Sequence, residues 1–342
     1  MDNLVRLGFR PSNLPEKSED EKRRHIAHVE KVISFTHSSV SVDQERKALD
    51  ALWRTELLTG KELVMTDQMM RLWLEYGLPS SFVRGIMWPW ASEKDAGVGK
   101  SDMQTDESSE FSSLIDLDLK RTLPFLGICD HEASMTKCKS VLLKFAKKFP
   151  VIGYTQGMSY ICTRLMLELN FDESKTFLCL QRIVARSPTI SCLYRLNLEE
   201  IRATVEFVLD TVAWDNLPSL WLGMKRIKFK PMEYCLIEWI ITMFVKNFNM
   251  RISGFIFDQF FLSGDVALFR AAIGILSLLG DTLSVYIERN ADIEEIKEVL
   301  TNANALIGGS DNFSNFTKAY TDVMISDNVE RLISDVIIHP VY

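Results

Sequence analysis

Helical periodicity recurs along most of this 342-residue chain, and it limits the possible folds more than any other feature. Apolar residues repeat at intervals of three and four, as at Leu49, Leu52 and Trp53, which is the spacing of one face of an α-helix. Strand signals are rare, and no repeat of fixed period occurs. The sequence therefore predicts an all-α protein, with helical blocks at about 135–149, 157–169, 173–186, 197–212, 231–247, 265–280 and 292–305.

Composition excludes several classes of protein. Seven Trp and 20 Phe supply a large core, while a net charge of −7 argues against a nucleic-acid partner. The six cysteines form no C-x-x-C pair, so we expect reduced, buried thiols in a cytoplasmic protein and no zinc site. No apolar stretch reaches the ~18–20 residues that span a bilayer. Any association with membranes would therefore be peripheral.

Changes in composition divide the chain into segments. We expect one main domain at 78–310, a helical extension at 1–77 and a helical tail at 311–342. Residues 91–110 are polar and rich in Gly and Ser, which predicts a flexible insertion. The role of 1–77 stays open between an extra helical layer, favoured by the apolar stripe at 49–53, and a segment that binds a membrane or a partner. The basic run Lys225, Arg226, Lys228 and Lys230 is interpreted as a solvated face.

One motif resembles a nucleotide site but fails on its context. The segment Gly97–Ser101 reads Gly-Val-Gly-Lys-Ser, like the end of a phosphate-binding P-loop. The first glycine of that motif would fall at Lys94, and no apolar strand precedes the segment. The chain is therefore not expected to bind GTP itself.

Two short segments carry the chemistry. The first, 115–124, contains Ile115, Asp118 and Arg121, and the second, 150–158, reads Pro-Val-Ile-Gly-Tyr-Thr-Gln-Gly-Met. One amphipathic helix is predicted between them. We expect Asp118, three residues before Arg121, to hold the guanidinium extended.

These segments resemble motifs of TBC domains, the GTPase-activating modules that act on Rab proteins. Ile115, Asp118 and Arg121 match I-x-x-D-x-x-R, and Tyr154 and Gln156 match Y-x-Q. The similarity covers about residues 78–290, with the motifs in family order. Further matches are Arg84-Gly85-x-x-Trp88 for R-G-x-x-W, Trp239 to Phe244 for W-x-x-x-x-F, and Phe257-Asp258-x-Phe260 for W-D-x-F, with Phe in place of the usual Trp.

The resemblance implies a TBC domain of two packed helical subdomains that acts on a GTP-bound Rab protein. Arg121 would be an arginine finger and Gln156 a glutamine finger, both supplied in trans. GTP and Mg²⁺ would come with the partner, so the chain would need no cofactor of its own. Residues expected to support the fingers or contact the partner are Asp118, Tyr154, Gly153, Gly157, Ile115, Arg84 and Trp88, with Trp88 favoured as core.

These residue types suit the reaction. A guanidinium is permanently charged and planar, so it can bind two phosphoryl oxygens at once, and an arginine finger accelerates GTP hydrolysis by about 10³–10⁵. The amide of Gln156 can accept from the attacking water while donating to the γ-phosphate. Both side chains are expected to converge on an open surface. The alternative is a non-catalytic scaffold or Rab effector, which the presence of both finger residues disfavours.

Overall fold

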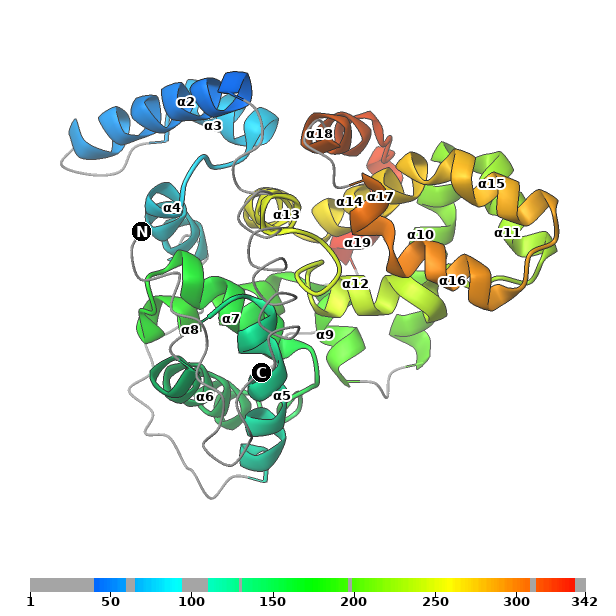
Figure 1. The fold of residues 1–342 in the computed structure, drawn as a ribbon. Helices are drawn as coiled ribbons and strands as arrows, with labels where there is room; N and C mark the ends of the chain where they lie inside the picture. Colours follow the sequence, from blue (N-terminus) through cyan, green and yellow to red (C-terminus); the bar gives the residue numbers. More distant parts are fainter. Residues whose placement is uncertain are drawn as a thin grey trace, which may run out of the picture.

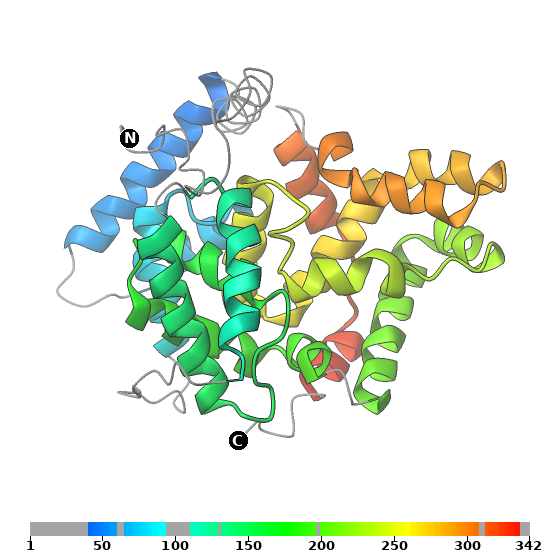
Figure 2. The same ribbon diagram turned by 60° about the horizontal axis from the view of Figure 1, so that its bottom comes forward.

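The computed structural model of the chain describes residues 40–59, 65–93, 110–128, 131–195, 199–307 and 312–335. Within these ranges every regular element is a helix, as the sequence predicted, and no strand occurs. The helices form two packed groups, and α13 (Met250–Ser263) runs between them (Figures 1 and 2).

The first group holds both motif segments. It consists of α2 (Val40–Thr59), α3 (Asp67–Tyr76), α4 (Ser81–Glu93), α5 (Ser112–Phe125), α6 (His131–Lys148), α7 (Met158–Glu168) and α8 (Glu173–Arg186). The second group consists of α9 (Pro188–Arg195), α10 (Glu199–Asn216), α11 (Pro218–Arg226), the π-helix η1 (Met232–Leu236), α12 (Ile237–Ile241), α14 (Asp265–Leu278), α15 (Gly280–Glu288), α16 (Ile293–Thr301), α17 (Ala303–Ile307), α18 (Asn312–Asp322) and α19 (Asp327–Asp335).

The prediction of one helix over 231–247 was wrong. The segment begins as η1, continues as α12 and ends in a turn where Met243 and Phe244 have φ of 45° and 63°. Both side chains are fully buried, so packing holds non-glycine residues in the left-handed region that they usually avoid. The block expected at 292–305 is also divided, since Asn302 separates α16 from α17. The sequence pattern did not predict α9, α11, α13 or α15.

Asp258, at the centre of α13, connects two sequence motifs: R-G-x-x-W in α4 and W-D-x-F in α13 itself. Arg84 of α4 donates to Asp258 through Nε at 2.9 Å and Nη2 at 2.8 Å, and the indole of Trp88 donates to the same carboxylate at 2.9 Å. Leu78 adds its backbone N–H at 2.9 Å. A buried carboxylate is stable when its charge and its lone pairs all find partners. The R-G-x-x-W and W-D-x-F motifs therefore meet in one buried network.

The helices outside the motif-bearing region also pack on the domain. In α2 the ring of Trp53 lies 6.3 Å from that of Trp73 in α3, and Trp73 donates to the carbonyl of Asp258 at 2.9 Å. In α18 the rings of Phe316 and Tyr320 lie 6.0 and 5.2 Å from Phe255 of α13. The described parts of the expected extension and tail thus share the core, while the boundaries at 77 and 310 stay predictions.

Some predicted segments lie outside the described residues, namely 1–39, residues 94–109 of the insertion expected at 91–110, with its Gly97–Ser101 motif, and 336–342. Residues 91–93, which were also expected in that insertion, instead complete α4, where Ala91 and Ser92 are buried. Across the part of the chain that is described, no single helix is both long and apolar enough to cross a membrane. The pair α14 and α15 meets both conditions together, but it is bent by 61°.

Candidate functional site

Arg121 stands on the exposed face of α5, and its side chain is 48% exposed. Its Nη2 lies 2.5 Å from Oδ1 of Asp118, one turn earlier on the helix. The other guanidinium donors of Arg121 have no hydrogen-bond partner among the described residues. Asp118 therefore holds the guanidinium of Arg121 through one N–H group, and the other N–H groups of this half-exposed side chain remain available.

Asp118 is almost completely buried and binds two motif segments at once. While Oδ1 pairs with Arg121, Oδ2 accepts the phenol hydrogen of Tyr154 at 2.6 Å. Burial, and then the hydrogen bond to Asp118, raise the pKa of Tyr154, so its hydroxyl remains a donor at all ordinary pH values. One carboxylate thus connects the arginine helix to the glutamine loop.

A second hydrogen bond fastens the same two elements. The hydroxyl groups of Thr122 in α5 and Ser159 in α7 lie 2.9 Å apart and are buried. In Figures 1 and 2, α5 and α7 lie side by side in the first group, with α6 next to both. The relative position of the arginine helix and the glutamine loop is therefore fixed by two polar contacts and by packing.

The loop that carries Gln156 needs glycine on both sides. Gly153 has φ of 61°, and a Cβ there would lie 2.6 Å from the ring of Phe111. Gly157 has φ of 110° and packs against Ile241 of α12. Gln156 itself is exposed, one residue before the glycine that caps α7. Both predicted finger residues are thus at the surface, on elements that Asp118 and Tyr154 hold together.

The surroundings of Arg121 include both charged groups and exposed apolar side chains. Burial raises the pKa of Tyr160 in α7, while the positive charges of Lys246 and Arg121 oppose that change. Leu117 of α5 is 63% exposed, and Val151 of the glutamine loop is 69% exposed.

Three further predicted site residues lie in the core. Ile115 and Trp88 are 0% exposed, and Arg84 is 7% exposed and binds Asp258 and Glu168. Burial thus keeps these three side chains away from the surface where a partner would dock. Ile115 packs α5 into the core, whereas Arg84 and Trp88 join α4 to α13.

Sequence reasoning missed two residues that contact the glutamine loop. Tyr194 of α9 accepts the Thr155 hydroxyl through its backbone carbonyl at 2.9 Å, and Ile241 packs against Gly157. A main-chain acceptor leaves no trace in sequence. The W-x-x-x-x-F motif was the available signal for Ile241, since Ile241 lies between Trp239 and Phe244 in the sequence.

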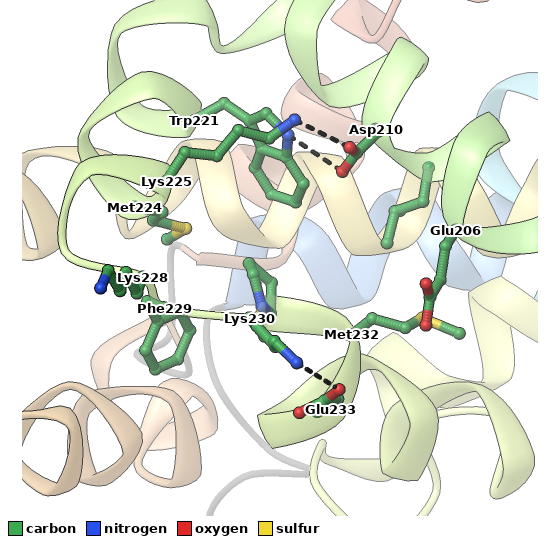
Figure 3. Close-up of a pocket in the computed structure, with 12 residues that line it drawn as sticks. Glu206, Asp210, Trp221, Met224, Lys225, Lys228, Phe229, Lys230, Met232 and Glu233 are labelled. Atoms are coloured by element: carbon green, nitrogen blue, oxygen red, sulfur yellow. Dashed lines mark hydrogen bonds and ion pairs between the residues drawn. The ribbon is translucent and has the colours of Figure 1, made fainter. Parts of the chain in front are cut away.

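A separate cavity of about 450 Å³ lies between α10, α11 and η1 (Figure 3). Trp221 and Phe229 are among the apolar residues that line it. On its rim, Lys225 and Lys230 pair with Asp210 and Glu233 at 2.8 and 2.9 Å, and the basic run that contains these lysines is exposed, as expected. This cavity shares no residue with the finger motifs. Among the described residues, no cluster of three or more His, Cys, Asp or Glu could hold a metal ion.

Known proteins resemble this chain in sequence. The family model of the Rab-GTPase-TBC domain matches residues 81–283. The chain is 28% identical to TBC1 domain family member 12 of Rattus norvegicus, over 94% of this chain and 52% of that protein. It is 26% identical to TBC1 domain family member 14 of Bos taurus, over 81% of this chain and 46% of that protein. The chain thus spans about half the length of these curated relatives.

Solved structures share the fold. The TBC domain of a flagellar RabGAP from Chlamydomonas superposes with a TM-score of 0.62 at 21% identity, over 84% of this chain and 97% of that one. The TBC domain of Skywalker from Drosophila melanogaster gives 0.56 at 13% identity, over 84% and 96%. Since the family model covers more than half of the sequence and the solved domains share its helical architecture, the chain belongs to the Rab-GTPase-TBC domain family.

Proposed function

We propose that this protein accelerates GTP hydrolysis by a Rab-family GTPase, with Arg121 and Gln156 as its two finger residues. TBC domains interact with Rab GTPases, so a Rab partner follows from the family. One observation carries the catalytic part: Asp118 is buried, yet it holds the exposed Arg121 with one oxygen and the glutamine loop with the other.

The role of Arg121 follows from its free donors. In GTP hydrolysis negative charge spreads over the γ-phosphoryl oxygens and the leaving oxygen. A guanidinium held at one corner by Asp118 can present its remaining N–H groups to those oxygens with little loss of side-chain entropy. Because docking excludes water, the interaction strengthens as the charge develops.

Gln156 has the chemistry to orient the attacking water. Its amide oxygen can accept a hydrogen from that water while its nitrogen donates to the γ-phosphate. The neutral side chain adds no charge that would compete with Arg121. In this proposal Asp118 and Tyr154 position both finger residues without contacting GTP or the attacking water.

The exposed apolar side chains near the fingers fit a protein partner. Leu117 and Val151 lie on the two elements that carry Arg121 and Gln156, and each exposes more than half of its surface. Exposed apolar residues that cluster at a charged site are typical of an interface. GTP and Mg²⁺ would arrive with the Rab protein, whose inactivation would regulate vesicle trafficking. The chain would then work in the cytoplasm and reach endomembranes peripherally, through this partner.

A panel of GTP-loaded Rab proteins tests the proposal. Phosphate release would be measured with wild type and with Arg121→Ala, at catalytic amounts of the chain. Arg71→Ala is a matched control, since Arg71 is an exposed arginine of α3. We expect strong stimulation of at least one Rab by wild type and Arg71→Ala, and loss of about two orders of magnitude or more with Arg121→Ala.

The same panel separates the alternative function. If wild type bound a GTP-loaded Rab but stimulated none of the panel, the chain would be a scaffold or effector, and the finger assignment would be rejected. Unfolding curves of the variants serve as a check, because Arg121 is exposed and its removal should leave stability nearly unchanged.

A further inference from the structure

The side chain of Gln156 is not held in place by hydrogen bonds to the described residues, and it is exposed. A free glutamine side chain carries about 1.5–2 kcal/mol of rotamer entropy, so the backbone must fix its starting direction. What holds the backbone of residues 155–157 therefore decides how well Gln156 is aimed.

Tyr194 makes two hydrogen bonds, one that joins this loop to α9 and one that joins α9 to α12 within the second group of helices. Its backbone carbonyl accepts the Thr155 hydroxyl at 2.9 Å, and its phenol donates to the backbone carbonyl of Ile241 at 2.8 Å. Both acceptors lie in the last turn of a helix, α9 and α12 respectively, where carbonyls lack intrahelical partners. Burial raises the pKa of Tyr194, so the phenol remains a donor.

Ile241 in turn contacts the loop that carries Gln156. Its carbonyl oxygen and its side-chain carbons Cγ1 and Cδ1 lie 3.4–3.5 Å from the position that a Cβ on Gly157 would take. The left-handed turn at Met243 and Phe244 follows directly and fixes where α12 ends. Strained, buried backbone of this kind persists where the surrounding structure defines it strongly, often next to a functional site.

We infer that Tyr194 is a positioning residue for Gln156, acting through Thr155 on one side and through Ile241 and Gly157 on the other. Thr155 is thereby anchored to α9, and Gly157 packs against the end of α12. The inference builds on the proposed function, because aim matters only if Gln156 orients the water. It assigns the second group of helices a part in the reaction, although that group carries neither finger.

Tyr194→Phe tests the inference, since it keeps the ring and removes the bond to Ile241. Tyr320→Phe in α18 is a matched control, because Tyr320 is also a buried tyrosine but packs against α13, away from the finger loop. With the Rab that wild type stimulates most, we expect Tyr194→Phe to lower kcat about three- to tenfold, the effect of one hydrogen bond, with KM unchanged. Tyr320→Phe should leave both constants at the wild-type level.

A double substitution distinguishes aiming from general stability. In a Gln156→Ala background, Tyr194→Phe should cost less than about twofold further, since the side chain it aims is gone. If the full three- to tenfold loss persisted there, or if Tyr194→Phe alone had no effect, the positioning role would be rejected while the proposed function stood. If wild type stimulated no Rab, both would be rejected.

Amide hydrogen exchange tests the same bracing without any Rab. Tyr194→Phe should accelerate exchange at residues 155–160 relative to wild type, and Tyr320→Phe should not. Thr155→Val, which removes the other bond, should accelerate exchange at the same amides. Unchanged exchange in both variants would overturn the inference even if the activity were lost.

Discussion

Arg121 and Asp118 form an ion pair whose two members lie in opposite environments, since the arginine side chain is 48% exposed and the aspartate 1%. In an ordinary surface pair both partners move freely in water and contribute little. Here the carboxylate is fixed, because Tyr154 binds its second oxygen. The pair therefore restricts the position of the arginine side chain and adds little to stability.

Asp118→Asn separates the effect of the ion pair on the position of Arg121 from its effect on stability. The amide keeps the shape and an acceptor for Tyr154 but loses the charge that attracts Arg121. We expect stimulated phosphate release to fall about tenfold or more, while the pair itself accounts for no more than about 1 kcal/mol of stability because Arg121 is exposed. Tyr154→Phe should give a smaller loss of the same kind. Wild-type activity in Asp118→Asn would show that Arg121 does not depend on this anchor.

Leu117→Ser addresses the docking surface. Leu117 is 63% exposed on the helix of Arg121, so polar substitution should weaken docking and raise KM about three- to thirtyfold, with kcat and the melting temperature unchanged. Leu222→Ser is the matched control, because Leu222 is 58% exposed on α11. An equal change in KM for both variants would argue against a partner surface around Arg121.

Gly153→Ala tests the geometry of the glutamine loop. At φ of 61° and with the Phe111 ring 2.6 Å from the new Cβ, alanine should destabilise the fold by about 1–3 kcal/mol and reduce stimulation. Gly85→Ala is the control, because Gly85 lies inside α4 and a Cβ there meets nothing closer than 3.6 Å. Helix propensity predicts that this variant is stabilised by up to about 1 kcal/mol. Thermal unfolding of both variants checks the contrast.

Much of the candidate site could be predicted because its information is local. Asp118 and Arg121 lie one turn apart on one helix, and Gly153 and Gly157 mark a loop that only glycine allows. The break after α12 could not be predicted, since Met243 and Phe244 continue the apolar pattern of a helix and their conformation comes from tertiary packing. Tyr194 was missed for a similar reason: its partners are the main-chain carbonyl of Ile241 and the hydroxyl of a threonine 39 residues away.

Asp265 gives the fold a defined pH dependence. It lies buried at the start of α14, where it accepts the backbone N–H of Thr189 at 2.8 Å. Burial is the largest cause that raises the pKa of Asp265 from 3.8 to about 6. The folded state thus binds a proton more tightly than the unfolded chain, so the contribution of this group to stability is greatest below pH ~4 and is lost as pH rises through ~6.

Asp265→Asn should remove this dependence while keeping an oxygen for Thr189. The free energy of unfolding of the variant minus that of wild type should increase between pH 4 and pH 7, by an amount of up to about 3 kcal/mol. Urea unfolding at several pH values measures it. A constant difference over this range would show that Asp265 titrates at its ordinary pKa.

Single-turnover phosphate release from a GTP-loaded Rab, with saturating wild type, Arg121→Ala or Gln156→Ala, tests the central claim most directly. If both side chains act on the transition state, each variant should still bind the Rab, and the rate should fall about 10²-fold or more for Arg121→Ala and substantially for Gln156→Ala. Rates equal to wild type in either variant, with the Rab fully bound, would contradict the account.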